Sequence, residues 1–168
     1  MLALHALSSP WLDALFRFSN LLGLPAFCVP LTLSAVAVHL RRGEHRAAWT
    51  WLVLGLGSVA VTEALKPLVG RPRPELWPHL VVAGGSSFPS GHALATAALF
   101  PFLGWLIWRR RPIGALAGAL VSAYVGLGRL YLGVHWPTDV LGGWLIGAIL
   151  CASAARCLHS PSPRPSPG

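Results

Sequence analysis

Charge is scarce in this sequence. Only 11% of its 168 residues are charged, whereas 54% are hydrophobic, and the mean hydropathy is +0.61. Soluble globular domains carry about 25% charged residues, so the composition excludes an ordinary soluble domain. It predicts an integral membrane protein of one domain, which we place at residues 1–158. The remaining segment, 159–168, is too rich in proline and serine to bury anything and is expected to be disordered.

Cysteine is also scarce, and its three positions show no pairing pattern. Cys28 and Cys151 lie inside apolar runs, and neither these two nor Cys157 stands in a CxxC motif or at zinc-ligand spacing from a histidine. An odd number of cysteines in such positions is not typical of a disulfide framework. We therefore expect no disulfides and no zinc site, and we predict no metal or other cofactor.

Acidic residues are few, with five Asp and Glu against thirteen Lys and Arg, so the net charge is +8 and the isoelectric point is near 11.1. A strongly basic chain often binds nucleic acid. Here, however, the basic residues fall in short clusters between apolar segments instead of covering one soluble face. We therefore expect no nucleic-acid partner and interpret the clusters as signals of membrane topology.

Five apolar segments are long enough, at about 20 residues each, to cross the hydrocarbon core of a membrane. Each must be helical, because lipid offers the backbone polar groups no other partner. The sequence therefore predicts an all-α, integral-membrane helical bundle with about five transmembrane helices. The expected spans are 21–40, 47–65, 91–108, 113–130 and 138–156.

An amphipathic segment, 9–20, precedes the first span. Its polar residues Asp13, Arg17 and Asn20 share one helical face, and apolar residues occupy the other. This pattern predicts a helix that lies in the membrane interface. Insertion of residues 1–20 as a sixth span is the alternative.

The connections between the spans alternate in charge. Arginine-rich connections at 41–46 and 108–112 fall on the same side as the C-terminal tail, and the positive-inside rule places that side in the cytoplasm. The other two connections, 66–90 and 129–137, then face outward and hold most of the remaining polar residues. A functional site is therefore expected at the outer face.

The first outer connection begins with three cationic residues. Lys66 is the only lysine of the chain, Arg71 and Arg73 follow it, and Glu63 stands three residues before it, at the spacing of a helical ion pair. An ammonium acts on a phosphate as a point charge, while a guanidinium bonds to two oxygens at once. The set is suited to anion binding, although membrane anchoring explains these residues equally well when the loop is taken alone.

A helix start follows in "FPSGHA" (88–93). Ser90 occupies the expected N-cap position, and the amides of Gly91 and His92 open the next helix, where anions bind. The glycine lets an anion approach the backbone, because it has no Cβ. An ordinary structural helix start is the alternative for this stretch alone.

The second outer connection brings together Arg129, His135 and Asp139. His135 and Asp139 are one helical turn apart, so the carboxylate can reach one ring nitrogen, fix the tautomer and leave the other nitrogen free to attack. Together with the cationic loop and the helix start, this arrangement predicts a phosphate pocket that contains a nucleophile and an acid.

These three stretches resemble the motifs of the type 2 phosphatidic acid phosphatase (PAP2) superfamily, K-x6-R-P, P-S-G-H and S-R-x5-H-x3-D. The matching residues are 66–74, 89–92 and 129–139, in the order and spacing of the family. One position departs from the pattern, because Gly128 stands where the family has a serine. The departure removes a possible hydroxyl contact but none of the catalytic groups that the resemblance implies.

The resemblance implies a role for each matching residue. His135 would attack phosphorus, and Asp139 would orient it and stabilise its charge. His92 would protonate the leaving oxygen and then activate water against the phosphohistidine. The phosphoryl oxygens would be held by Lys66, Arg73, Ser90, the amide of Gly91, and Arg129. The family spacing selects Arg73, but Arg71 is close enough to share its role.

The resemblance further implies a metal-independent phosphatase of the outer membrane face whose substrate is a lipid phosphate or diphosphate. Phosphatidate, phosphatidylglycerol phosphate and undecaprenyl diphosphate are the candidate types, and a lipid A phosphatase or a phosphotransferase is also open. The compact chain and the resemblance favour a bacterial inner membrane with the site facing the periplasm or exterior. The sequence leaves the substrate and the oligomeric state undetermined.

Two other functions are weighed against this one. A vanadate-dependent haloperoxidase would use the same pocket, but the haloperoxidases of the family are soluble and much larger. A non-catalytic lipid-phosphate binder, channel or transporter would use the polar groups without turnover. The presence of both His92 and His135 with Asp139 argues against the second alternative.

Overall fold

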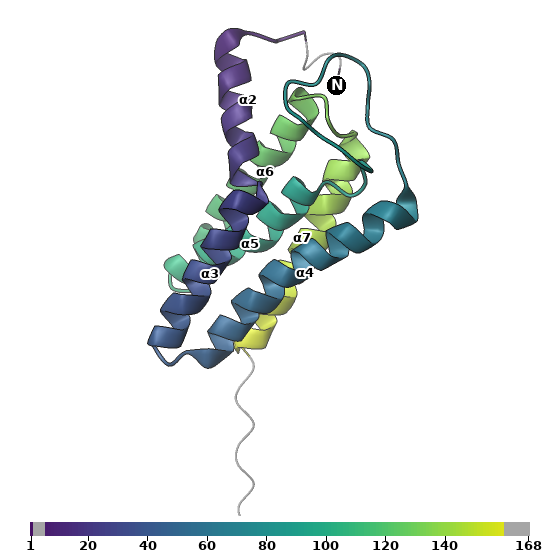
Figure 1. Ribbon diagram of the computed structural model, residues 1–168. Coiled ribbons are helices and arrows are strands. Elements are labelled where there is room, and N and C mark those ends of the chain that lie inside the picture. The colour runs from purple at the N-terminus through teal and green to yellow at the C-terminus, as the bar shows by residue number, and fades with distance from the viewer. Residues whose placement is uncertain (2–5, 160–168) are drawn as a thin grey trace, which may run out of the picture.

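The computed structural model describes residue 1 and residues 6–159, and within this part of the chain the protein is made of six helices with no strand (Figure 1). The helices are α2 (Pro10–Leu22), α3 (Pro25–Arg41), α4 (His45–Val69), α5 (Gly91–Ile107), α6 (Pro112–Tyr131) and α7 (Pro137–His159). The predicted all-α class is confirmed. Of the expected disordered tail, 159–168, only His159 is among the described residues.

Four of the five expected spans each correspond to one helix, whereas the first, 21–40, is broken at Gly23 and Leu24 between α2 and α3. The helices also differ in length. Three helices, α4, α6 and α7, are long and apolar enough to cross a membrane on their own, and α2 and α3 qualify together as a fourth span that is bent by 44°. Both α3 and α5 have 17 residues, fewer than a full crossing at 1.5 Å per residue requires. Helix length therefore supports three or four spans where the sequence predicted about five.

The break between α2 and α3 differs in place from the expectation. The chain bends at Gly23 and Leu24, beyond the predicted boundary at residue 20, and two polar residues of α2 face the bundle. Asp13 accepts a hydrogen bond from the Tyr131 hydroxyl (2.5 Å), and Asn20 accepts one from Arg129. The N-terminal helix is thus attached to α6 by polar contacts.

Glycines allow α6 and α7 to pack closely on α5. A Cβ at Gly118 would lie 2.1 Å from the main-chain oxygen of Phe100, and one at Gly147 would lie 2.4 Å from that of Leu94. A helix backbone cannot move aside as a side chain can, so the close approach requires positions without a side chain. This packing holds the start of α5 beside the α6–α7 turn.

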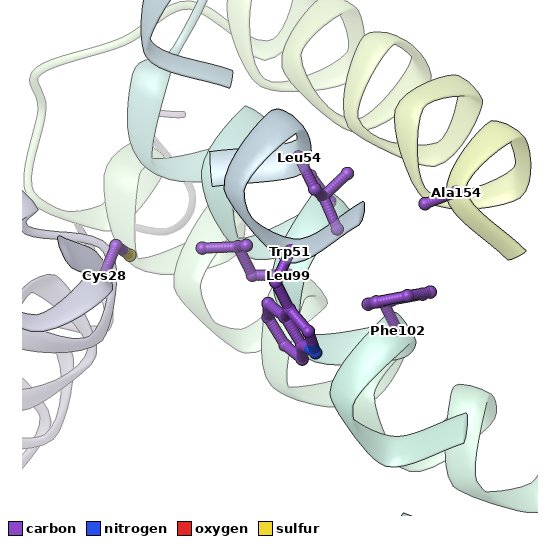
Figure 2. Close-up of a cluster of buried hydrophobic side chains, with 7 residues drawn as sticks. Cys28, Trp51, Leu54, Leu99, Phe102 and Ala154 are labelled. Carbon is purple, nitrogen blue, oxygen red and sulfur yellow. The ribbon is translucent and has the colours of Figure 1, made fainter. Parts of the chain in front are cut away.

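A buried apolar cluster joins α4 to α5 (Figure 2). Trp51 of α4 meets Phe102 of α5 edge to face, with the ring centroids 5.1 Å apart, and Leu54 and Leu99 complete the contact. Each fully buried side chain of this size stabilises the fold by about 1.5–3 kcal/mol. The cluster therefore fixes α4 against α5 in the half of the two helices that is away from the connection 70–90.

The two connections that were expected to face outward lie at the same end of the bundle (Figure 1). They are residues 70–90, between α4 and α5, and residues 132–136, between α6 and α7. The arginine-rich α3–α4 connection and the end of α7 lie at the opposite end. The polar connections and these basic segments, which alternate along the sequence, therefore lie at opposite ends of the bundle.

Candidate active site

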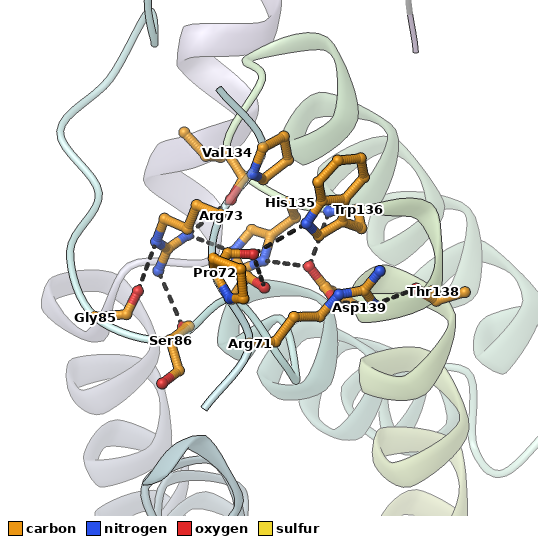
Figure 3. A network of polar contacts seen from close by, with 12 residues as sticks. Arg71, Pro72, Arg73, Gly85, Ser86, Val134, His135, Trp136, Thr138 and Asp139 are labelled. Carbon is orange, nitrogen blue, oxygen red and sulfur yellow. Dashed lines mark hydrogen bonds and ion pairs between the residues drawn. The ribbon is translucent and has the colours of Figure 1, made fainter. Parts of the chain in front are cut away.

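Two segments that are far apart in the sequence meet at this end of the bundle: the α4–α5 connection, and the α6–α7 turn with the start of α7 (Figure 3). The α4–α5 connection contributes Arg71 and Arg73, the α6–α7 turn contributes His135, and the first turn of α7 contributes Asp139. The helix start at α5 lies beside them, because the main-chain N–H of Ser90 donates to the main-chain oxygen of Asp139 (3.0 Å). The fold thus brings the three sequence motifs into one site.

His135 is buried and is held from both sides. Its Nδ1 lies 3.6 Å from Oδ2 of Asp139, which is an ion-pair distance and longer than a hydrogen bond, and its Nε2 lies 3.3 Å from Nη1 of Arg73. A guanidinium can only donate, so Arg73 favours the tautomer in which Nε2 carries the lone pair and Nδ1–H faces the carboxylate. A nucleophilic imidazole needs this tautomer.

Asp139 is fully buried, and both of its carboxylate oxygens have partners. Oδ1 accepts a hydrogen bond from Arg71 (2.9 Å), and Oδ2 accepts one from the main-chain N–H of Trp136 (2.8 Å). A carboxylate without water keeps its charge only when such donors surround it. Asp139 is therefore an anion fixed in the first turn of α7. His135 lies in the turn before that helix, so the expected helical turn between the two residues is not formed, although their side chains still meet.

Arg73 connects the two outer connections. Its guanidinium donates to the main-chain oxygens of Gly84 and Val134, both at 2.8 Å, and approaches the ring of His135. Burial lowers the pKa of Arg73 from its ordinary value, and the negative charge of Asp139 acts in the opposite direction. A guanidinium starts from so high a pKa that it stays charged at neutral pH, so Arg73 brings a cation to the His135 ring.

The start of α5 has the form that the sequence predicted. Ser90 is the N-cap residue, with an extended backbone, and its buried Oγ has no hydrogen-bond partner among the described residues. A buried hydroxyl without a partner costs free energy. A Cβ on Gly91 would lie 3.1 Å from Cγ2 of Thr62, so a larger residue would crowd the space between α5 and α4. This helix start is suited to accept an anion.

Arg129 is a buried cation whose side-chain partner is uncharged. Its side chain donates through Nη1 to Oδ1 of Asn20, and its Nε has no hydrogen-bond partner within the described part of the chain. A buried charge is costly unless an opposite charge compensates it. Arg129 is thus held ready to neutralise an anion.

Lys66 forms the ion pair that its spacing predicted. Its Nζ lies 2.8 Å from Oε1 of Glu63, one turn earlier in α4, and both side chains are partly exposed to solvent. Exposed ion pairs contribute at most about 1 kcal/mol. Lys66 can therefore exchange Glu63 for a phosphoryl oxygen at little cost.

A cavity of about 350 Å³ extends from these residues between α3, α4 and α5. Its polar wall contains Lys66, Arg73, Gly91, His92, Arg129 and His135. Its apolar wall continues along α3 and α4, for example at Val29, Leu33, Leu56 and Val59, whose side chains are exposed on the outside of the bundle. The cavity therefore combines a cationic end with an apolar extension, which suits an amphipathic anion.

The N-terminal helix contributes residues that the sequence did not predict for the site. Besides the contact of Asn20 with Arg129, the main-chain oxygen of Asn20 faces the His92 ring, and a Cβ on Gly23 would lie 2.5 Å from Cδ2 of His92. The only signal in the sequence was the polar face of segment 9–20. That face indicated amphipathicity but not which side of the helix meets the bundle.

The donor set does not resemble a metal site. No group of three or more His, Cys, Asp or Glu that could hold a metal ion occurs in the described ranges. Of the acidic residues, only Asp139 lies against His135, and its oxygens are bonded to Arg71 and Trp136. The local charge is instead supplied by guanidinium groups.

The acid limb of the pH profile should reveal the environment of His135. Burial, followed by the charges of Arg129 and Arg73, lowers the pKa of His135 to about 4, although Asp139 opposes this shift. Neutral imidazole then persists far below the ordinary pKa of about 6.5. We expect kcat/KM to fall only as the pH approaches about 4, after correction for the second ionisation of the substrate phosphate near 6.

The same shift predicts the pH dependence of stability. The unfolded chain binds a proton at its ordinary His pKa of about 6.5, whereas folded His135 does so only near 4. Stability contributed by neutral His135 is therefore complete above about 6.5 and is lost as the pH falls toward 4. A corrected acid limb that remains near 6.5 in kcat/KM would contradict this environment for His135.

Gly128, where the family motif has a serine, faces a hydroxyl from another helix. A Cβ at this position would lie 2.1 Å from Oγ of Ser19 on α2, and that hydroxyl donates to the main-chain oxygen of Phe16 (2.7 Å). Ser19 is fully buried. A hydroxyl of α2 therefore occupies the space that a side chain at Gly128 would need.

Restoring the family serine should therefore destabilise this protein. Gly128→Ser overpacks the contact with Ser19, and we expect a loss of about 1–3 kcal/mol in the free energy of unfolding. Adding Ser19→Ala should recover most of this loss, because it removes the conflicting Oγ. Thermal unfolding in detergent of the wild type, the two single variants and the double variant gives the coupling free energy between positions 19 and 128. Strictly additive effects would show that the two positions do not compete for the same space.

Comparison with known proteins agrees with the geometry. The chain matches the PAP2 superfamily over residues 47–161. It is 32% identical over 152 residues to phosphatidylglycerophosphatase B of Bacillus subtilis, covering 84% of this chain and 72% of that protein. It is 31% identical over 165 residues to the lipid A 4'-phosphatase of Bacteroides thetaiotaomicron, covering 83% of this chain and 71% of that protein.

A solved structure shows the same fold. The crystal structure of a transmembrane PAP2-type phosphatidylglycerolphosphate phosphatase from Bacillus subtilis superposes with a TM-score of 0.82 at 28% identity, over 92% of this chain and 80% of that one. An integral-membrane lipid phosphatase, a hydrolase, is the class that this fold and site define. The chain belongs to the PAP2 superfamily, as the spacing of its motifs predicted.

Proposed function

We propose that this protein removes phosphate from a lipid phosphate or diphosphate, without a metal ion, through a phosphohistidine at His135. One observation carries the proposal. The buried imidazole of His135 is held between Asp139 and Arg73 at the cationic end of a cavity that continues along α3 and α4 with largely apolar walls. A site of this shape places a phosphate next to a nucleophile and a hydrocarbon chain next to apolar side chains.

In the first step, Arg73 turns its N–H from Nε2 of His135 to a phosphoryl oxygen. The freed lone pair on Nε2 attacks phosphorus, and the bond from phosphorus to the lipid oxygen breaks. Asp139 orients the ring and stabilises the positive charge that it gains. His92, which lines the same cavity, supplies the proton that the leaving oxygen takes up. A bound phosphate next to His92 favours the protonated ring that this step needs.

In the second step, water attacks the phosphohistidine and releases inorganic phosphate. His92, now neutral, accepts the proton of that water and returns to its starting state. His135 regains its lone pair as the bond between nitrogen and phosphorus breaks. The two displacements leave the enzyme unchanged and transfer the phosphoryl group to water.

Cationic side chains and helix amides take the part that a magnesium ion has in many phosphoryl-transfer enzymes. The proposed phosphate ligands are Lys66, Arg73, Ser90, the Gly91 amide and Arg129. Donors that are already in place stabilise the charge of the transition state without reorganisation. Arg129 and Ser90 fit this role well, because each has a buried polar atom without a hydrogen-bond partner among the described residues.

The substrate is proposed to enter from the lipid leaflet between α3 and α4, where the apolar wall of the cavity reaches the outside of the bundle. Its chemical identity is best sought among the substrates of the relatives. These proteins are called a phosphatidylglycerophosphatase and a lipid A 4'-phosphatase, and a putative undecaprenyl-diphosphatase of Escherichia coli is 45% identical over 73 residues. The candidates from these names are phosphatidylglycerol phosphate, undecaprenyl diphosphate and lipid A, and the resemblance of the motifs adds phosphatidate.

The orientation in the membrane is proposed from charge. The arginine-rich ends of the helices lie opposite the site, so the positive-inside rule places the site at the outer face. In a bacterial inner membrane that face is the periplasmic side. The headgroup of a lipid in the outer leaflet would then meet the cationic end of the cavity directly.

Gly55 should control access for long lipid chains. It lies on the cavity wall of α4, and a Cβ there would lie 2.7 Å from Cγ2 of Thr32 on α3. We expect Gly55→Leu to lower kcat/KM for long-chain lipid phosphates by roughly tenfold or more, because the side chain enters the cavity. A short-chain, water-soluble phosphatidate should be affected much less.

The matched control is Gly57→Leu, two residues later in the same helix. A Cβ at Gly57 meets nothing within 4 Å, so the substitution leaves the cavity intact. Phosphate release from a long-chain and from a short-chain substrate is measured for the wild type, Gly55→Leu and Gly57→Leu. Equal losses for both chain lengths in Gly55→Leu would show that the substrate chain does not pass between Gly55 and Thr32.

The proposed function is tested by phosphate release from purified protein in detergent with EDTA present, over a panel of the candidate lipids. Phosphate release that persists in EDTA would support metal-free lipid phosphatase chemistry. The relative rates for the different lipids would identify the preferred headgroup. Release that stops with EDTA and returns with a divalent cation would overturn the metal-free mechanism. Binding of these lipids without any release would instead favour a non-catalytic binding protein.

A further inference from the structure

Arg71 differs from the other arginines of the site in where its side chain points. Its Nη1 donates to Oδ1 of Asp139 (2.9 Å) and to Oγ1 of Thr138 (2.5 Å), and its guanidinium lies over the Trp136 ring at 5.5 Å (Figure 3). Arg73, by contrast, lines the cavity, and Arg71 is not among the residues of its wall. The two arginines of one short loop therefore face opposite sides of the His135–Asp139 pair.

The main chain around Arg71 is held as firmly as its side chain. The carbonyl of Arg71 accepts a hydrogen bond from the main-chain N–H of Ser87 (2.8 Å). The carbonyl of Pro72 accepts one from Oγ of Ser87 and one from Nε1 of Trp136, both at 3.0 Å. The loop is thus fastened to the start of α7 next to the Arg71 side chain.

The hydrogen bond from Arg71 restricts the orientation of the Asp139 carboxylate. With Oδ1 bonded to Arg71, the other oxygen, Oδ2, is left for the Trp136 N–H and for Nδ1 of His135. A carboxylate freed from Arg71 could rotate and offer either oxygen to the ring. The guanidinium also neutralises part of the charge that Asp139 exerts on His135.

We propose that Arg71 is a positioning residue that fixes Asp139 and thereby orients His135, and that it does not hold the phosphate. The proposal rests on the proposed function in one respect, namely that His135 is the attacking group. The two arginines of the loop then have different roles, because Arg73 binds the phosphate and Arg71 binds the carboxylate of Asp139.

The test compares Arg71→Gln and Arg71→Lys with Arg73→Gln and with Arg111→Gln, a control in the exposed α5–α6 turn. We expect Arg71→Gln to lower kcat by about tenfold to a hundredfold and to leave inhibition by inorganic phosphate unchanged. Arg73→Gln should weaken phosphate inhibition by about tenfold or more, because a charged hydrogen bond is lost. Arg71→Lys should recover part of the rate, since it keeps the charge.

The pH profile separates a positioning role from a purely structural one. Without the Arg71 charge, Asp139 attracts a proton to His135 more strongly, so the acid limb of kcat/KM should move to higher pH in Arg71→Gln and much less in Arg71→Lys. A loss of stability alone would lower the amount of active enzyme but leave the limb in place. Weaker phosphate inhibition in Arg71→Gln, or an unmoved limb with unchanged kcat, would overturn the proposal.

A second readout does not depend on turnover. In protein labelled with ¹⁵N-histidine, the ring signals of His135, assigned by their absence from His135→Asn, report its tautomer and its titration midpoint. We expect a mixed tautomer or an upward shift of the midpoint in Arg71→Gln and a spectrum like wild type in Arg111→Gln. Unchanged His135 signals in Arg71→Gln would overturn the positioning role. Absence of lipid hydrolysis by the wild type would count against the proposed function alone.

Discussion

His135→Ala is expected to abolish phosphate release, with a loss of about 10⁴-fold or more in kcat, because no other group in the site can take over nucleophilic attack. His92 lines the same cavity, but it carries no carboxylate partner among the described residues. Binding of inorganic phosphate should survive, since the cationic ligands remain. The measurement is lipid phosphate hydrolysis together with phosphate binding by the same purified variant.

His45→Ala is the matched control for this experiment. His45 is exposed at the start of α4, at the end of the bundle opposite the site, so its removal should leave the rate unchanged. A His135→Ala protein that folds and hydrolyses lipid phosphates at the wild-type rate would exclude His135 as the nucleophile. Loss of both turnover and phosphate binding would point to a collapsed site and not to the loss of one group.

Arg129→Met is expected to change activity and stability in opposite directions. Arg129 is buried, and its side-chain partner is the uncharged Asn20. Replacing it with an apolar side chain of similar length should stabilise the protein by about 1 kcal/mol or more, because a buried charge is removed. The same change should lower kcat by about 10²–10³-fold, as the loss of one donor to an oxyanion does.

Thermal unfolding with and without inorganic phosphate distinguishes this outcome from simple damage. Phosphate should raise the unfolding temperature of the wild type, since a ligand stabilises the state that it binds, and it should do so much less in Arg129→Met. Arg111→Met, in the exposed turn, should respond to phosphate as the wild type does. A less stable and inactive Arg129→Met would show that the arginine holds the fold together and is not kept for the anion.

The core of the site could be predicted from the sequence because its chemistry is local. Asp139, at the start of α7, is only four residues from His135 in the preceding turn, so the two side chains can meet without any distant contact. The residues around Ser90 are also sufficient to predict a helix start there. Apolar length likewise predicted a helix at each expected span. What could not be predicted is how many of these helices are long enough to cross a membrane, because helix boundaries shift by a few residues. Helix α3 begins only at Pro25, after the break, and both α3 and α5 have 17 residues.

Contacts between segments that are far apart in the chain could not be predicted from the sequence. Asn20 reaches Arg129 across 109 positions, and Arg71 reaches Asp139 across 68. Spacing suggested that Arg71 could stand in for Arg73, but only the fold shows them on different sides of the His135–Asp139 pair. The same holds for Ser19, which occupies the space beside Gly128 without any motif that links the two positions.

A phosphohistidine at His135 can be detected directly on the enzyme. The protein is mixed with a lipid phosphate, quenched with alkali, in which phosphohistidine survives, and its peptides are read by mass spectrometry. We expect phosphate on His135 during turnover and none on the His135→Ala protein. Steady turnover with no phosphorylated histidine, or with phosphate on His92 instead, would contradict the proposed mechanism.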